Sequence, residues 1–103
     1  MLIIVDKQYK SSYVMEFRCD DKNEFPNYLE VLVEVEGFSL IVVGARIRVL
    51  CKGGNIEADR KFRLAQMENL NNRLKQIKYP TVVLGDFNGR EKWMKCHKVL
   101  QVI

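Results

Sequence analysis

Residues Thr81–Gly89 read Thr-Val-Val-Leu-Gly-Asp-Phe-Asn-Gly, and this stretch decides the fold. The first four residues form a short, mostly β-branched run, which is typical of a strand buried on both faces. Alternation along an extended chain then places Asp86 and Asn88 on one side and Phe87 on the other. An Asx turn, in which Asp86 and Asn88 bond nearby backbone, is the structural alternative. The functional interpretation predicts that Phe87 anchors the strand while a carboxylate and an amide face a cleft.

The segment Val83–Asn88 resembles the signature of the endonuclease/exonuclease/phosphatase family, whose members have the deoxyribonuclease I-like fold. The expected order of elements agrees with this resemblance. A strand at Ser39–Arg48 is followed by a helix that carries Arg63 and Gln66, and then by the Gly-Asp-Phe-Asn strand. The resemblance covers the central and later part of the chain. It implies that residues 1–103 form a single, partial domain of the family.

Members of this family cleave phosphodiester or phosphomonoester bonds with a divalent metal, usually Mg²⁺. The resemblance implies that Asp86 orients or deprotonates the attacking water and that Asn88 hydrogen-bonds the phosphoryl oxygen. Arg46 stands where the family strand normally carries a histidine, and its guanidinium can bind phosphate in a bidentate manner. The family's metal-binding glutamate and its Asp-His pair have no counterpart in this chain. We therefore assign no metal ligand and expect weak or no activity of the chain alone.

Two functions from different classes follow from these observations. The first is a metal-dependent phosphohydrolase, with a nuclease favoured because the motif lies in the basic part of the chain. The second is a non-catalytic module that keeps the fold and binds nucleic acid or a protein. A truncated chain is a third, structural alternative, in which a homo-oligomer or a partner chain completes the sheet, because half of a sandwich would expose an apolar face.

Composition is that of a globular chain, with 48% hydrophobic, 10% aromatic and 29% charged residues. The net charge of +4 conceals an asymmetry. Residues 1–40 hold four basic and eight acidic side chains, whereas residues 41–103 hold thirteen basic and five acidic. The basic part suits a polyanionic partner such as nucleic acid or another phosphate ester; a solvated basic surface without a specific ligand is the alternative.

The three cysteines lack metal-ligand spacing, and no apolar run approaches the length of a membrane span. An odd number of cysteines without a Cys-x-x-Cys pair indicates reduced thiols, and we expect a cytoplasmic protein. The only histidine, His97, lies between lysines and is not assigned a catalytic role. No membrane association is expected.

Hydrophobic periodicity predicts an α/β (α+β) fold with a mixed, mostly antiparallel sheet and one long helix, resembling part of the deoxyribonuclease I-like two-sheet sandwich. Glu36-Gly37 supplies a two-residue hairpin turn. In the strand before this turn, Leu29–Val35, alternation places Glu30 on the face that is largely exposed to solvent. Besides the motif strand, the expected elements are strands at Leu2–Val5, Tyr13–Cys19, Leu29–Val35 and Phe38–Val49, a helix at Ile56–Ile77, and a weakly helical segment at Arg90–Val102.

One side of the predicted helix is apolar and is expected to pack on the sheet. Its stripe consists of Met67, Leu70, Leu74 and Ile77. Asp59 and Arg63 are four residues apart and can form an ion pair. With Gln66 they lie inside or beside the apolar stripe, so we expect these polar groups to tie the helix to the sheet rather than to act in catalysis.

Overall fold

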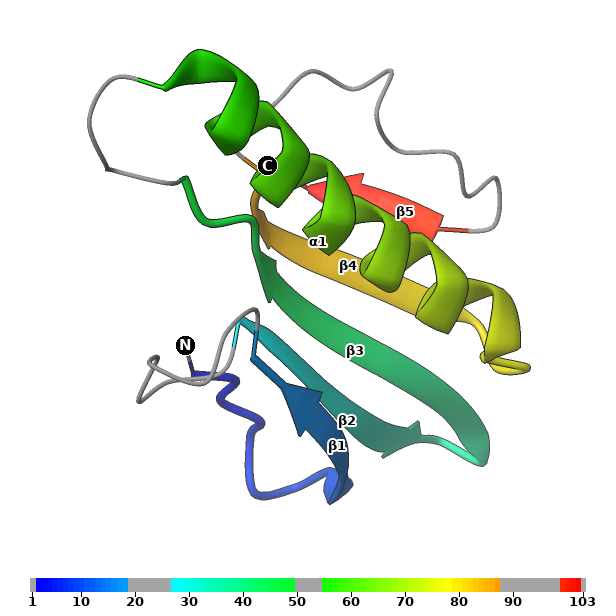
Figure 1. Cartoon of the computed structure of the whole chain (residues 1–103). Coiled ribbons are helices and arrows are strands. Elements are labelled where there is room, and N and C mark those ends of the chain that lie inside the picture. The colour runs from blue at the N-terminus through cyan, green and yellow to red at the C-terminus, as the bar shows by residue number, and fades with distance from the viewer. Residues whose placement is uncertain (1, 19–26, 50–54, 88–98, 103) are drawn as a thin grey trace.

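The computed structural model describes residues 2–18, 27–49 and 55–87, and the backbone of residues 99–102 (Figure 1). Five strands and one helix lie within these ranges. In chain order they are β1 (Lys10–Phe17), β2 (Tyr28–Val35), β3 (Phe38–Arg46), α1 (Ile56–Gln76), β4 (Thr81–Asp86) and β5 (Val99–Val102). The α+β class predicted from the sequence is confirmed.

The five strands form one mixed sheet in the order β1-β2-β3-β4-β5. β1 to β3 are an antiparallel meander, whereas β3, β4 and β5 pair in parallel. A parallel pair cannot be joined by a tight turn, and here α1 provides the crossover from β3 to β4 (Figure 1). The described residues thus form a sheet layer and a helix layer; a second sheet, as in the deoxyribonuclease I-like sandwich, is not among them.

The hairpin between β2 and β3 has the turn that the sequence predicts. Glu36 and Gly37 both have positive φ, 49° and 79°, as a two-residue type I′ turn requires. The turn fixes the register of the two strands, from Val35 opposite Phe38 to Tyr28 opposite Ala45. This register sets which residues of β2 and β3 share each face.

Helix α1 covers one face of the sheet and forms the main core with it. The predicted stripe is confirmed: Met67, Leu70 and Leu74 are buried, and Ile77 packs against the same cluster. Alternate residues of the sheet complete this core: Tyr28 from β2, Ile41, Val43 and Ala45 from β3, Val83 from β4, and Ile47 and Phe87 just after these strands.

Glu30 departs from its predicted place in solvent, because its strand face lies under α1. The side chain is 1% exposed. Both carboxylate oxygens accept from Arg73 of α1, with Nε to Oε2 and Nη2 to Oε1 each 2.8 Å. The Tyr28 hydroxyl donates to Glu30 Oε2, also at 2.8 Å. A buried carboxylate is stable only when it is paired and hydrogen-bonded, so this cluster fixes α1 over β2.

Two further predictions are corrected. Leu2–Val5 is not a strand; it lies beside the sheet without pairing in it. The helix expected over Arg90–Val102 is wrong for Val99–Val102, which pair in parallel with β4, because backbone pairing in the sheet overrides weak helical periodicity. Residues 88–98 of that prediction lie outside the described ranges. The one helix that the structure describes, α1, is not apolar enough to cross a membrane.

We predict that replacing Arg73 by Met destabilises the protein by about 3 kcal/mol, because the Glu30 carboxylate would remain buried without its cation. Urea unfolding followed by circular dichroism measures this change. Lys75→Met, at an exposed position in the same helical turn, is the control and should change the stability by less than about 0.5 kcal/mol. Equal effects of the two substitutions would contradict the role given to the pair.

The same cluster predicts a loss of stability in alkali. Burial, with the hydrogen bond to Glu30, raises the pKa of Tyr28 above its ordinary value of 10.0. The folded state therefore holds the phenol proton where the unfolded state has lost it, so the contribution is complete below pH 10.0 and falls as the pH rises further. The free energy of unfolding, measured with urea from pH 8 to pH 11, should fall less steeply with pH for Tyr28→Phe than for the wild type. The difference in slope corresponds to about one proton released on unfolding. An identical slope would refute the assignment.

Candidate functional site

The carboxyl ends of β3 and β4 bring together two of the three sequence-predicted site residues. In the parallel register Arg46 is the direct neighbour of Asp86. The pairing continues past the strands, where the Ile47 amide donates to the Asp86 carbonyl at 2.9 Å. Because adjacent parallel strands end at the same edge, a cation and a carboxylate that are forty residues apart lie side by side.

The side chains around Asp86 alternate as predicted from the motif. Phe87 is buried in the core under α1, whereas Asp86 is exposed on the opposite face of the sheet. The anchoring role of Phe87 is thereby confirmed. Asn88 lies outside the described residues, so its placement beside Asp86 stays a prediction.

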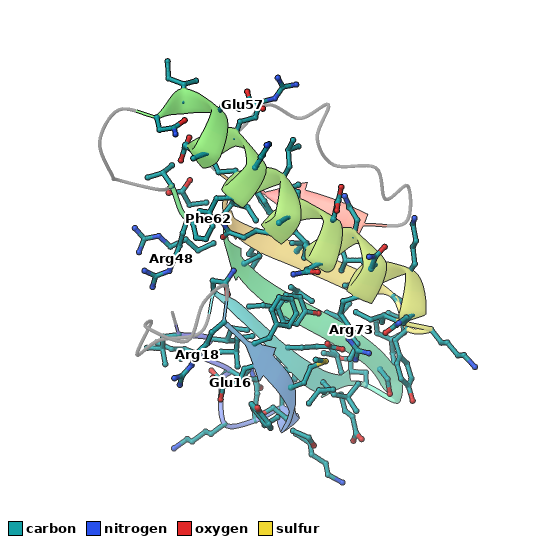
Figure 2. All side chains as sticks on the ribbon, viewed as in Figure 1. Glu16, Arg18, Arg48, Glu57, Phe62 and Arg73 are labelled. Carbon is teal, nitrogen blue, oxygen red and sulfur yellow. The ribbon has the colours of Figure 1, made fainter. Side chains whose placement is uncertain are left out.

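Asp86 and Arg46 line one end of a hollow of about 850 Å³ on the face of the sheet that α1 does not cover. Arg48, two residues beyond Arg46, lines the same end and extends past the tip of β3 (Figure 2). Gly44, Arg46 and Arg48 are every second residue of this stretch, and all three line the hollow. The remaining lining is mainly apolar and comes from β2, β3, β4 and the N-terminal segment: Leu2, Ile3, Ile4, Val5, Asp6, Tyr9, Val33, Val35, Val42, Val43, Ala45, Leu84 and Gly85.

Gln66 of α1 fixes the backbone that carries Arg48. Its Oε1 accepts from the Arg48 amide at 2.7 Å, and its Nε2 donates to the Arg48 carbonyl at 2.9 Å. The prediction that Gln66 ties helix to sheet is confirmed, and Arg63 forms the expected ion pair with Asp59, Nε to Oδ2, at 2.9 Å. Arg48 lies beyond the end of β3. The Gln66 amide group therefore gives the Arg48 backbone the two hydrogen bonds that a neighbouring strand would otherwise provide.

Asn27 is a supporting residue that the sequence reasoning missed. It is buried, its carbonyl accepts from the Arg46 amide at 2.9 Å, and its Nδ2 donates to Gln66 Oε1 at 3.4 Å. Asn27 thus holds the end of β3 from the β2 side while Gln66 holds it from the helix side. Asn27 lies between the predicted strands Tyr13–Cys19 and Leu29–Val35, where a polar residue gives no sign of burial, so only the structure shows this role.

The adjacent strand β3 explains why the motif has a glycine at position 85. A Cβ added here would lie 1.7 Å from the carbonyl oxygen of Ala45, far inside van der Waals contact. Ala45 and Gly85 are direct neighbours in the parallel register. The close approach of β3 and β4 next to the Arg46 and Asp86 pair therefore requires glycine.

The residues that the structure describes do not fit a magnesium site by themselves. They contain no group of three or more His, Cys, Asp or Glu side chains that could hold a metal ion. Magnesium prefers six oxygen ligands, and the strand ends supply one carboxylate, that of Asp86. The other carboxylate of the hollow, Asp6, comes from the N-terminal segment.

We predict that Gly85→Ala destabilises the protein by more than about 3 kcal/mol, because β3 and β4 must separate to admit a methyl group. Gly37→Ala is the control: its Cβ would meet nothing within 4 Å, and only the positive φ opposes alanine, at a cost of about 1–2 kcal/mol. Urea unfolding of both variants measures the difference. A smaller loss for Gly85→Ala than for Gly37→Ala would show that the strands accommodate the methyl group.

Comparison with known proteins returned no match for this chain among protein families, curated proteins or solved structures. The resemblance to the endonuclease/exonuclease/phosphatase family therefore depends on the residues Val83–Asn88 and on the order of the elements around them.

Proposed function

We propose that this protein is a phosphohydrolase of the endonuclease/exonuclease/phosphatase type that acts on phosphodiesters at the carboxyl ends of β3 and β4. The observation that carries the proposal is the exposed carboxylate of Asp86 beside the exposed guanidinium of Arg46 in adjacent parallel strands. Both side chains line an open hollow, so a substrate can reach them.

The two kinds of side chain have complementary tasks in phosphate-ester hydrolysis. The guanidinium groups of Arg46 and Arg48 bind the non-bridging oxygens and offset the charge that develops on them. The Asp86 carboxylate accepts a proton from water as the water oxygen bonds to phosphorus. The bond between phosphorus and the ester oxygen breaks, and this oxygen takes a proton from solvent and leaves as an alcohol. Asn88 is proposed as a further donor to the phosphoryl oxygen, on the resemblance alone.

The charge of the chain favours a nucleic acid as the substrate. Residues 41–103 carry thirteen basic and five acidic side chains, and Arg46, Arg48 and Asp86 of the site belong to this part. A basic surface attracts a polyanion over distances of about 10 Å at 0.1 M salt, and successive phosphates add to the effect. A nuclease is therefore favoured over a phosphatase for small monoesters.

Plasmid nicking, measured with and without magnesium chloride, tests the proposal. Asp86→Asn should lower the rate by at least about 100-fold, the usual contribution of a general base, with little change in DNA affinity. Glu68→Gln, an exposed carboxylate on α1, is the control and should leave the rate unchanged. Nicking by Asp86→Asn at the wild-type rate would refute the proposal.

A non-catalytic nucleic-acid-binding module is the second candidate, and the pair of guanidinium groups at the end of the hollow favours it. Filter binding and the nicking assay together distinguish the binding module from the phosphohydrolase. Filter binding of DNA would weaken with salt and be reduced by Arg46→Met, while neither wild type nor Asp86→Asn would cleave. Cleavage that depends on Asp86 would exclude this alternative.

A further inference from the structure

The hollow extends along the strands and is longer than a phosphate site requires. Its lining reaches from Val35, beside the turn between β2 and β3, to Arg46 at the end of β3. Val35 is opposite Phe38, and β3 covers nine residues from Phe38 to Arg46, which corresponds to about 26 Å. A volume of about 850 Å³ over this length makes the hollow long and narrow.

Aliphatic side chains line the hollow between its two ends. Val33, Val42 and Leu84 contribute from β2, β3 and β4. Ile3 and Val5 contribute from the N-terminal segment, where both are partly buried. The middle of the hollow therefore has apolar walls on the sheet and on this segment. Burying an apolar group between these walls is favourable, whereas burying a charge there is costly because no partner is at hand.

Two guanidinium groups give one end of the hollow an excess of positive charge. Arg46 and Arg48 lie there with Asp86, and neither guanidinium forms an ion pair with another residue that the structure describes. Arg48 Nε is buried and has no hydrogen-bond partner within the described ranges. The remaining charged residue of the lining, Asp6, accepts from the Gln8 amide through Oδ1 at 3.0 Å. An anionic oxygen at the arginine end would satisfy the buried donor.

This distribution of charge distinguishes two kinds of anion. A nucleic-acid strand carries a phosphate at every nucleotide, so beyond the arginine end it would lay further phosphates on aliphatic walls. Nucleic acid can therefore use the arginine end but not the length of the hollow. A molecule with one anionic group and a long unbranched alkyl chain matches both the charged end and the apolar length.

We propose that the hollow binds a single-chain amphiphilic anion, a long alkyl chain with one carboxylate or phosphate-like head group. The head group lies on Arg46 and Arg48, and the chain runs between the sheet and the N-terminal segment toward Val35. This inference goes beyond the proposed function, because the binding requires no reaction at Asp86. The amphiphile and a nucleic-acid phosphate share the two arginines, so the bound amphiphile keeps nucleic acid from the site.

Isothermal titration calorimetry with butanoate, octanoate and dodecanoate, each below its micelle concentration, tests the proposal. The Kd should fall by at least about 100-fold from butanoate to dodecanoate, because each buried methylene adds to the affinity. One dodecanoate should bind per chain. Dodecylphosphonate, whose bond between phosphorus and carbon is not an ester, should bind in the same way, and dodecyltrimethylammonium at least about 10-fold more weakly. Equal affinity for butanoate and dodecanoate, or for dodecanoate and the cation, overturns the proposal.

Variants locate the chain and the head group separately. Leu84→Asn, at 39% exposure on β4 in the hollow, should raise the Kd for dodecanoate by at least about 10-fold, and Leu64→Asn, at 36% exposure on α1, should leave it unchanged. Arg46→Met should remove the preference for dodecanoate over the cation but keep the dependence on chain length. Circular dichroism confirms that each variant is folded.

A Kd for dodecanoate that neither Leu84→Asn nor Arg46→Met changes, or that Leu64→Asn raises as much as Leu84→Asn, also overturns the proposal. The titrations contain neither DNA nor metal. Their failure is therefore distinct from a failure of the proposed function, which nicking by Asp86→Asn tests.

Discussion

The close parallel pairing of β3 and β4 is the constraint on which the rest of the structure depends. It requires Gly85, because no side chain fits between its Cα and the Ala45 carbonyl. It also sets Arg46 beside Asp86 and directs Phe87 into the core under α1. Each residue of the Gly-Asp-Phe part of the motif thus has its own physical task. Glycine permits the approach, the aspartate faces the hollow, and the phenylalanine holds the strand end in place.

Support for this strand end comes from residues distant in the sequence. Gln66 from the helix holds the backbone of Arg48, and Asn27, just before β2, accepts from the Arg46 amide. The Glu30 and Arg73 pair fixes the same helix over β2 further along. Because polar contacts of this kind have strict geometry, they orient α1 more narrowly than apolar packing alone. The position of the cationic side chains at the hollow follows from this orientation.

Much of this arrangement could be predicted from local pattern, and the remainder could not for identifiable reasons. The turn at Glu36-Gly37, the stripe on α1 and the alternation around Phe87 depend on neighbours in sequence, so periodicity revealed them. Glu30 was misplaced because its partner Arg73 lies forty-three residues away, and a charged residue without a visible partner is expected in solvent. Val99–Val102 became a strand through pairing with β4, which weak helical periodicity cannot reveal.

The crossover between β3 and β4 has a consequence for the order in which the chain acquires its structure. The β2–β3 hairpin closes over a two-residue turn, whereas β4 can join β3 only after residues 47–80 have been brought back across the sheet. Closing a long segment costs more entropy and is slower than closing a short one. The meander can therefore form during synthesis before β4 has been made. On this argument Arg46 is in place at the end of β3 before Asp86 joins it.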